Sequence, residues 1–315
     1  MLNDTTFHPH QNVDNSCTSN NFKTQGDLDS LRSTVKLTVS LVIAVLCPVA
    51  VVGNALILAT IWKKSFQRAS FHILLSGMAL TDFFTGLIAQ PSYVSFSLIS
   101  SSSATVTQDQ PVAIVVLRVV TVFSAIYFVT ITLLTITVMS IERWFHMSGG
   151  SSLSSRCRFF VVIVIVILPI PLVTLYFLNP PLFPIIVPTE MFSCYLVTSF
   201  AYFKIYRIIR SHQNQIQTNG IPRNFGHSAI DLTKYKRSVA TILYILLLFS
   251  LCFLPYIVSN AVSFLIKADP REWSITIDVT MVLVFLSSSL SPGLYLWRMR
   301  DIRNGLKELI VCRRT

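Results

Sequence analysis

Long apolar stretches separated by short polar segments occupy almost the whole chain. A helix needs about 20 mostly apolar residues to cross roughly 30 Å of hydrocarbon, and seven stretches meet this length. They are Leu37–Trp62, Phe71–Ile99, Val112–Met139, Phe159–Leu178, Phe183–Ile209, Val239–Ile266 and Ile275–Trp297. Because a backbone amide inside a bilayer finds no water, each stretch is predicted to be a helix that satisfies its own hydrogen bonds. The predicted fold class is an all-α membrane protein, a seven-transmembrane helix bundle.

A different pattern follows the seventh stretch. Its apolar positions recur at helical spacing and polar positions oppose them; the apolar ones are Met299, Ile302, Leu306 and Ile310. This pattern predicts a short amphipathic eighth helix on the inner leaflet. Cys312 beside it is a candidate for palmitoylation, with an unmodified cysteine as the alternative. The chain therefore divides into an N-terminal tail (1–34), a seven-helix domain (35–297) and a cytoplasmic helix with a short tail (298–315).

Composition and charge favour a membrane over water or nucleic acid as the chain's environment. Hydrophobic residues make up 52% of the chain and charged residues 12%, with a mean hydropathy of +0.63. The net charge is +11, and most Lys and Arg residues fall in loops on one side of the predicted bundle. Short loops rich in these residues stay cytoplasmic, so we expect a plasma-membrane protein with its N-terminus outside and its C-terminus inside. A folded basic module for nucleic acid is not predicted.

The polar N-terminal tail is expected to be extracellular. It shows no cleavable signal peptide, so the first span is expected to act as its own insertion signal. Asn3-Asp4-Thr5 is a sequon, which makes Asn3 a candidate glycosylation site.

One carboxylate, Asp82, stands midway along the second stretch among apolar and small residues. An ionisable group inside a bilayer is costly, which makes Asp82 a candidate for function. It is either a buried carboxyl, held neutral or satisfied by neighbouring hydroxyls, or the centre of a cation site. Hard cations prefer oxygen ligands. Hydroxyls that could join it from the third and seventh stretches are those of Thr132, Ser287, Ser288 and Ser291.

Two further features mark places where the bundle could change shape. Glu142 and Arg143 adjoin at the cytoplasmic end of the third stretch, where a solvated ion pair is the simpler interpretation. Prolines at positions 91, 169, 171, 255 and 292 interrupt helical hydrogen bonding and permit kinks. Such kinks are either architectural or points of bending.

Six different short motifs follow one another along the chain, each in or beside a different one of the seven stretches. They are Gly53-Asn54, Ala79-Leu80-Thr81-Asp82, Ile141-Glu142-Arg143-Trp144, Tyr202 with Lys204-Ile205-Tyr206-Arg207, Phe249 with Cys252-Phe253-Leu254-Pro255, and Ser291-Pro292-Gly293-Leu294-Tyr295. In this order the chain resembles the rhodopsin-like (class A) G-protein-coupled receptors, over roughly residues 35–312.

The resemblance implies a receptor that converts binding of an extracellular small molecule, lipid or peptide into activation of a heterotrimeric G protein. It implies no enzymatic activity. Arrestin, membrane lipids and a second receptor chain are further partners that it suggests. An allosteric sodium ion is the one cofactor-like ligand implied, held by Asp82, Thr132, Ser287 and Ser291.

The resemblance also assigns switch residues at the cytoplasmic half. Arg143 would leave Glu142 and receive a G-protein helix when the sixth helix swings outward. Tyr202 and Tyr295 would turn inward to hold the open state. Phe249 and Phe253 would stand at the sixth-helix motif. A ligand shifts such an equilibrium only through its difference in affinity between the two states.

Several positions depart from the family pattern. Trp144, Phe253 and Ser291 replace switch residues, which keeps open a seven-helix receptor that binds but does not couple, as a scavenger or dimer partner. A transporter is a further alternative, but it would carry several charges along a path. Arg118 stands where the family has a disulfide cysteine, and Cys194 replaces a fifth-helix proline. These departures resemble the melanocortin, adenosine, cannabinoid and lysophospholipid receptor branch.

A ligand pocket is expected at the outer end of the bundle. Its predicted residues are Gln90, Tyr93, Arg118, Thr121, Tyr256, Asn260 and Asp278. Arg118 would suit an anionic ligand group; alternatively it pairs with Asp278 or Glu190 and closes the outer surface. Ala125 stands at the position of the amine-binding aspartate of related receptors, which argues against a monoamine.

Overall fold

The computed structural model describes residues 14–63, 70–102, 111–149, 155–179, 183–218, 226–267 and 270–311. The predicted glycosylation and palmitoylation positions, Asn3 and Cys312, lie outside the described residues.

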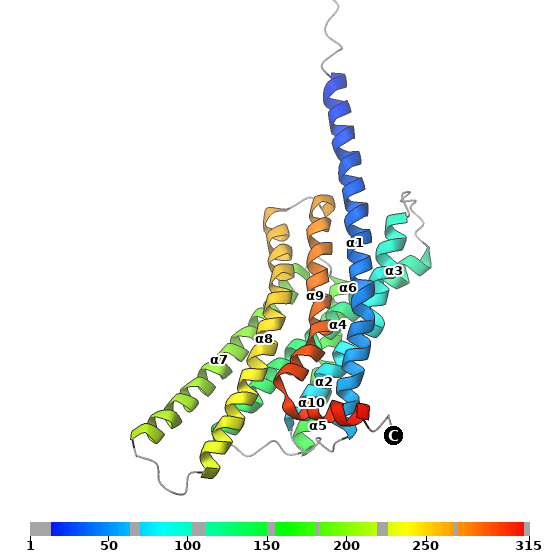
Figure 1. Cartoon of the computed structure of the whole chain (residues 1–315). Helices are drawn as coiled ribbons and strands as arrows, with labels where there is room; N and C mark the ends of the chain where they lie inside the picture. Colours follow the sequence, from blue (N-terminus) through cyan, green and yellow to red (C-terminus); the bar gives the residue numbers. More distant parts are fainter. Residues whose placement is uncertain are drawn as a thin grey trace, which may run out of the picture.

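Every predicted span coincides with one helix or with two or three helical elements in succession (Figure 1). The elements are α1 (Asp14–Lys63), α2 (Ser70–Phe84), the π-helix η2 (Thr85–Ala89), α3 (Gln90–Ser102), α4 (Val112–Met147), α5 (Ser155–Ile167), α6 (Pro169–Leu178), α7 (Phe183–Thr218), α8 (Gly226–Ile266), α9 (Pro270–Arg298) and α10 (Arg300–Val311). The α2–η2–α3 run forms the second span and the α5–α6 pair the fourth. The all-α, seven-span fold class is therefore confirmed.

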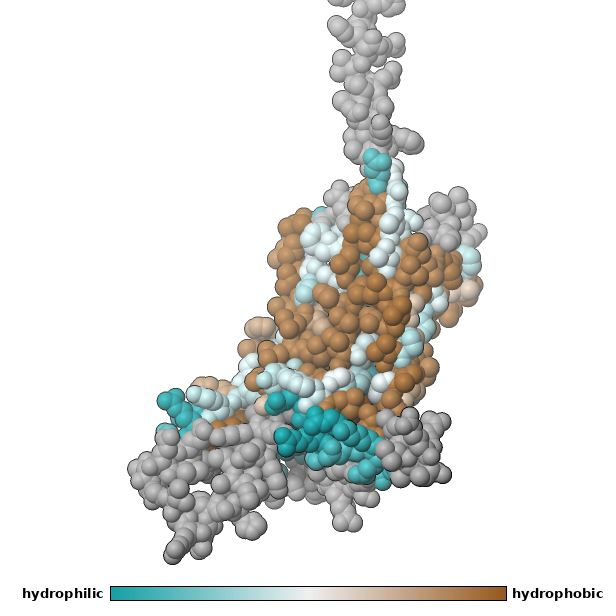
Figure 2. All heavy atoms as spheres, viewed as in Figure 1, coloured by the Kyte–Doolittle hydropathy of each residue, from teal (hydrophilic) through white to brown (hydrophobic). Residues whose placement is uncertain are grey.

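On the face shown in Figure 2, the surface of the bundle is apolar over most of its height. Among the described residues, five helices are long and apolar enough to cross a membrane, and Phe160–Leu175 is a shorter apolar segment. Large side chains face outward on several helices: Leu251 of α8 is 74% exposed and Phe192 of α7 is 65% exposed. An apolar belt of this extent is suited to hydrocarbon rather than to water, so the chain is a multi-pass membrane protein.

Two predicted spans are interrupted where the sequence suggested continuous helices. The fourth breaks between α5 and α6 at Leu168, because Pro169 and Pro171 cannot donate backbone hydrogen bonds to the preceding turn. The second passes through η2 just before Pro91, where the Gln90 amide donates to the Thr85 oxygen, five residues back, as in a π-helix. Pro255 and Pro292 instead lie inside helices that continue past them.

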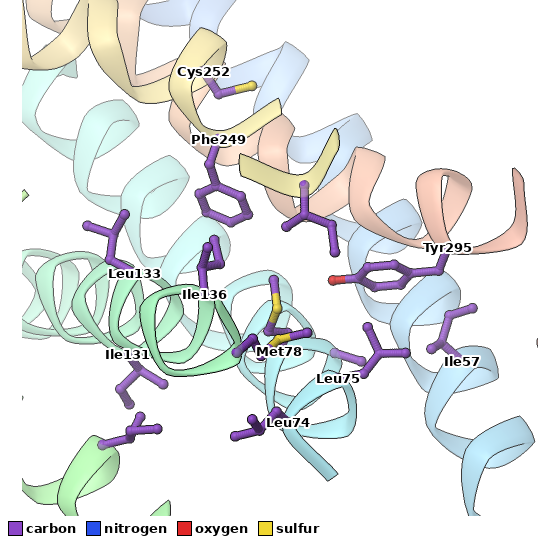
Figure 3. Close-up of a cluster of buried hydrophobic side chains, with 14 of the residues drawn as sticks. Ile57, Leu74, Leu75, Met78, Ile131, Leu133, Ile136, Phe249, Cys252 and Tyr295 are labelled. Atoms are coloured by element: carbon purple, nitrogen blue, oxygen red, sulfur yellow. The ribbon is translucent and has the colours of Figure 1, made fainter. Parts of the chain in front are cut away.

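Buried aliphatic and aromatic side chains fill the centre of the bundle (Figure 3). Ile57 of α1, Leu75 of α2, Ile136 of α4 and Phe249 of α8 are at most 1% exposed. One cluster thus joins four elements that are far apart in the sequence. Its packing fixes how the polar side chains of the bundle meet.

The first helix packs closely against two others through glycines. A Cβ at Gly53 of α1 would come within 2.9 Å of Pro292 Cγ in α9, and one at Gly86 of η2 within 2.9 Å of Ala50 Cβ. Asn54, which follows Gly53 on α1, donates from Nδ2 to the Ser288 backbone oxygen of α9 at 3.1 Å. Cys47 Sγ donates to the Gly86 oxygen at 3.0 Å. These contacts hold α1, η2 and α9 in register.

Replacing Gly86 with alanine is expected to lower the free energy of unfolding by about 1–3 kcal/mol, because α1 and η2 must separate to admit the methyl group. Gly77→Ala in α2 is the matched control, since a Cβ there meets nothing within 4 Å. Thermal unfolding of the two purified variants in the same detergent measures the difference. Equal melting temperatures for both would contradict the close packing of α1 on η2.

The predicted eighth helix is present as α10, which crosses one end of the bundle in Figure 1. Ile302 is 1% exposed and Leu306 is half-buried, whereas Arg303 and Lys307 are exposed. The apolar face of α10 therefore packs on the bundle and its basic face points away. We refer below to this end as the α10 end and to the opposite end as the far end.

Candidate functional site

Asp82 lies at the polar centre of the bundle. The residue is 1% exposed and its Oδ2 atom has no hydrogen-bond partner among the described residues. Ser288 and Ser291 of α9 lie beside the carboxylate. An unpartnered carboxylate oxygen in so dry a place is costly, so the site is built to hold something or to keep a proton.

Nearby hydroxyls are oriented in a way that suits a cation. Thr132 Oγ1 donates to the Phe128 oxygen at 2.9 Å, Ser287 Oγ to the Val284 oxygen at 2.7 Å and Ser291 Oγ to the Ser287 oxygen at 2.9 Å. A hydroxyl whose proton is engaged by the backbone still has lone pairs to offer. The set therefore supplies oxygen ligands rather than donors, which is the chemistry of a hard cation site.

A cavity of about 20 Å³ adjoins Asp82, and Thr132, Ser287 and Ser288 are among its lining residues. This volume accommodates one water molecule or a small ion. Among the described residues no three His, Cys, Asp or Glu side chains come together as a metal cluster. The cavity beside Asp82 therefore offers one carboxylate and several neighbouring hydroxyls to a ligand of this size.

Two phenylalanines of α8, Phe249 and Phe253, are among the residues that line this cavity. The rings of Phe249 and Phe253 stack with their centroids 5.2 Å apart and their planes 7° from parallel. Phe253 is 3% exposed, and it lines both the cavity at Asp82 and a second cavity nearer the far end. The two cavities share Ala125, Val129 and Val284 as well. A change at Phe253 therefore reaches both.

The second cavity has a volume of about 40 Å³ and is enclosed by α4, α7, α8 and α9. Its walls are mostly aliphatic and aromatic, with Tyr256 among them. Glu190 of α7 is the one carboxylate in the lining; its Oε2 accepts a hydrogen bond from Thr130 Oγ1 at 3.3 Å. From the sequence, Glu190 was expected only on the outer surface, as an alternative partner of Arg118. The sequence near the start of a helix does not reveal which neighbours the helix will face, so this cavity was not predicted.

Another polar group gathers between α1, α3 and α9 towards the far end. Tyr93 of α3 donates to Asp278 Oδ1 of α9 at 2.9 Å, and the cations Arg32 and Lys36 of α1 lie near that carboxylate. Lys36 Nζ also donates to Ser100 Oγ at 3.4 Å. The structure thus brings together Tyr93 and Asp278, and adds two cations of α1 that the sequence did not single out.

The other predicted ligand residues are placed differently. Gln90 is fully buried and donates from Nε2 to the Phe285 oxygen at 3.2 Å. Thr121 and Asn260 bond within their own helices, to the oxygens of Leu117 and Tyr256. Arg118 is exposed on α4, whereas Asp278 and Glu190 bond to Tyr93 and Thr130. Tyr256 is the member of the predicted set that lines the second cavity.

The Tyr93–Asp278 bond is expected to tie α3 to α9. Tyr93→Phe and Asp278→Ala should each destabilise the protein by about 1–3 kcal/mol, since each leaves a buried polar partner unsatisfied. The double variant should lose less than the sum of the two, with a coupling of about 0.5–3 kcal/mol. Thermal unfolding of all four proteins measures this coupling. Strict additivity would show that the bond contributes nothing.

The predicted switch residues lie at the α10 end. Arg143 of α4 is half-buried and lies close to Tyr202 of α7, whose hydroxyl is also near Ser140. Glu142, the residue before Arg143, is half-buried, and one of its carboxylate oxygens is buried without a hydrogen bond to any described residue. Trp144 packs edge-on against Phe200 of α7, with ring centroids 5.7 Å apart. The substituted tryptophan therefore joins α4 to α7.

Tyr295 of α9 is completely buried, and its ring lies beside Ile57 and Leu75 in Figure 3. Among the described residues its hydroxyl makes no hydrogen bond, and it lies near Ser291 and Asp82. The tyrosine thus extends the polar centre towards the α10 end. A buried hydroxyl without a partner is a group that a change of helix positions could satisfy.

Comparison with known proteins agrees with this architecture. Residues 182–295, from just before α7 to near the end of α9, match the family described as 7 transmembrane receptor (rhodopsin family). No curated protein sequence matches the chain. Among solved structures, squid rhodopsin superposes with a TM-score of 0.71 at 14% sequence identity, covering 90% of this chain and 87% of that one.

At this identity the structural likeness establishes the fold, and the family match covers the last three spans. The chain is a seven-helix membrane protein with the fold of rhodopsin. Its last three spans carry the sequence features of the rhodopsin family, which consists of signalling receptors rather than enzymes.

Proposed function

We propose that the chain is a G-protein-coupled receptor, in which a ligand bound near the far end changes the arrangement of helices at the α10 end. In this proposal the far end is extracellular, the α10 end is cytoplasmic and the membrane is the plasma membrane. The abundance of Lys and Arg in the loops of the α10 end supports this orientation.

The observation that carries the proposal is the stacked arrangement of two cavities on either side of Phe253. A ligand in the second cavity contacts Phe253 directly, and the same ring bounds the polar centre at Asp82. A shift of α8 that moves this ring alters the surroundings of Asp82, and Tyr295 lies beside Asp82 towards the α10 end. Binding and helix movement are then coupled through packed side chains.

At the α10 end, Arg143 and Tyr202 are the residues proposed to meet the G protein. Arg143 supplies a guanidinium that can bond to carbonyl oxygens of an inserted helix. Tyr202 lies close enough to support it. Lys204 and Arg207 follow on α7, stacked over Phe200 and Phe203 at 5.2 and 5.9 Å from the ring centroids. These residues place positive charge along the same side of the bundle.

Sodium is proposed to stabilise the inactive arrangement. Asp82, Thr132, Ser287 and Ser291 would hold the ion, and Ser288 joins them as a residue of the cavity. An ion that binds the closed arrangement better than the open one opposes activation by its difference in affinity. Its removal would therefore raise activity in the absence of any agonist.

The experiment is G-protein dissociation in cells that express the full chain, screened with purines, lysophospholipids, lipid amides, amines and basic peptides. We expect at least one class to give a response that Arg143→Ala removes. Arg118→Ala, which changes an exposed arginine of the same helix, is the control for surface expression. A response of equal size in Arg143→Ala would contradict the proposed coupling, and silence of a well-expressed chain to every class would favour a receptor that does not couple.

A further inference from the structure

The second cavity contains a carboxylate oxygen to which none of the described residues donates a hydrogen bond. Glu190 Oε1 is buried and makes no hydrogen bond among the described residues, while Oε2 accepts a hydrogen bond from the hydroxyl of Thr130. A hydroxyl is a neutral donor and leaves the charge of a carboxylate uncompensated. The described lining of the cavity includes no Lys, Arg or His. The charge on Glu190 therefore lacks a partner from the protein within this cavity.

The rest of the cavity lining is mostly apolar and includes flexible methionine side chains. Val187 and Met191 of α7 flank Glu190, and Leu133, Met281 and Val284 lie on the other helices. Methionine side chains adapt to ligands of different outline. Phe253 and Tyr256 add aromatic faces, which attract cations as well as apolar groups. A ligand that matches this cavity has one positive, hydrogen-donating group and an apolar body.

Size limits what the cavity holds. A volume of about 40 Å³ admits an ammonium group with a few carbon atoms, and a larger body must extend beyond this volume. Ala125 on α4 has no polar atom to offer, so the charge partner comes from α7 on another wall. The absence of a carboxylate at Ala125, taken from sequence alone as evidence against amines, is thus offset by Glu190.

We propose that this cavity binds an apolar primary or secondary amine, whose ammonium group pairs with Glu190 and whose carbon body packs against Phe253, Tyr256 and Met281. The inference rests on the proposed function only in taking this cavity as the ligand site; it names the chemical class of the ligand. Because Phe253 forms part of the wall, a bound amine also contacts the side chain that separates this cavity from Asp82.

The test is the thermal stability of the purified full-length chain in detergent, measured with matched amines and alcohols. The amines are propylamine, butylamine and 2-phenylethylamine, and the controls are 1-propanol, 1-butanol and 2-phenylethanol. We expect amines to raise the melting temperature of the wild type and the alcohols to have no comparable effect. In Glu190→Gln, which keeps shape and removes charge, amine affinity should fall by roughly 30-fold or more.

Asp301→Asn is the matched control, because it neutralises an exposed carboxylate of α10 and leaves the cavity unchanged. It should retain amine binding. Equal stabilisation by amines and alcohols, undiminished amine affinity in Glu190→Gln, or no stabilisation by any amine of the series would overturn the proposal. The readout needs no G protein. Amine binding without G-protein activation would support the amine site and contradict the proposed coupling. Activation by another class of ligand, with no amine binding, would support coupling and contradict the amine site.

Discussion

Replacing Asp82 with asparagine is expected to abolish the stabilisation of the protein by sodium. The wild type should melt at a higher temperature in sodium chloride than in choline chloride at the same ionic strength, because a ligand that binds only the folded state stabilises it. Asp82 supplies the one carboxylate of the cavity, whose other polar lining atoms are hydroxyls of Thr85, Thr132, Ser287 and Ser288. Without its charge, neutral oxygens alone compete poorly with water for a cation.

Asp301→Asn is the matched control for this measurement. Asp301 is an exposed carboxylate of α10, so its loss removes one charge without touching the cavity. It should keep the full difference between sodium and choline. A sodium effect that survives in Asp82→Asn would place the ion elsewhere. If the wild type melts at the same temperature in both salts, Asp82 is instead a neutral carboxyl satisfied by Ser288 and Ser291.

Replacing Phe253 with alanine is expected to lower the free energy of unfolding by about 3–5 kcal/mol, more than any other substitution proposed for this protein. The ring is 3% exposed and stacks on Phe249 at 5.2 Å, so its removal forfeits a buried aromatic contact and merges two cavities. Thermal unfolding in detergent measures the loss. The size of the cost depends on how far α8 and α9 can relax into the space.

Phe192→Ala provides the comparison, since this phenylalanine of α7 is 65% exposed on the apolar surface. Its replacement should change the melting temperature little, because the exposed Phe192 ring contacts lipid or detergent rather than the core. Similar losses in both variants would mean that Phe253 is not the packed wall between two cavities. Phe253→Leu should fall between the two, as it refills part of the space.

The helical elements could be predicted from sequence because their length and apolar character follow from the bilayer itself. The break at Leu168 could not, since Pro169 and Pro171 stand inside an otherwise continuous apolar run. A proline inside an apolar helix either kinks it, as Pro255 and Pro292 allow, or divides it. Which outcome occurs depends on the packing of neighbouring helices, and this information is not local.

Parts of the candidate site could be predicted from helical spacing. Ser287 and Ser291 are four residues apart, so they share one face of a helix, and Asp82 was the one deep carboxylate to which that face could turn. Glu190 and Arg118 show where such reasoning ends. Both are charged residues near the far end. The Glu190 side chain on α7 lines a cavity, whereas the Arg118 side chain on α4 is exposed. Helix rotation, set by packing, decides between these outcomes.

The measurement that tests the central claim most directly is nucleotide exchange on a purified heterotrimeric G protein, driven by the full chain reconstituted in lipid nanodiscs. The account predicts that the wild type accelerates exchange, more so in choline than in sodium, and that Arg143→Ala reduces the rate to that of empty nanodiscs. Exchange at the rate of empty nanodiscs for the folded wild type, across the major classes of G protein and with ligands of each class present, would contradict it.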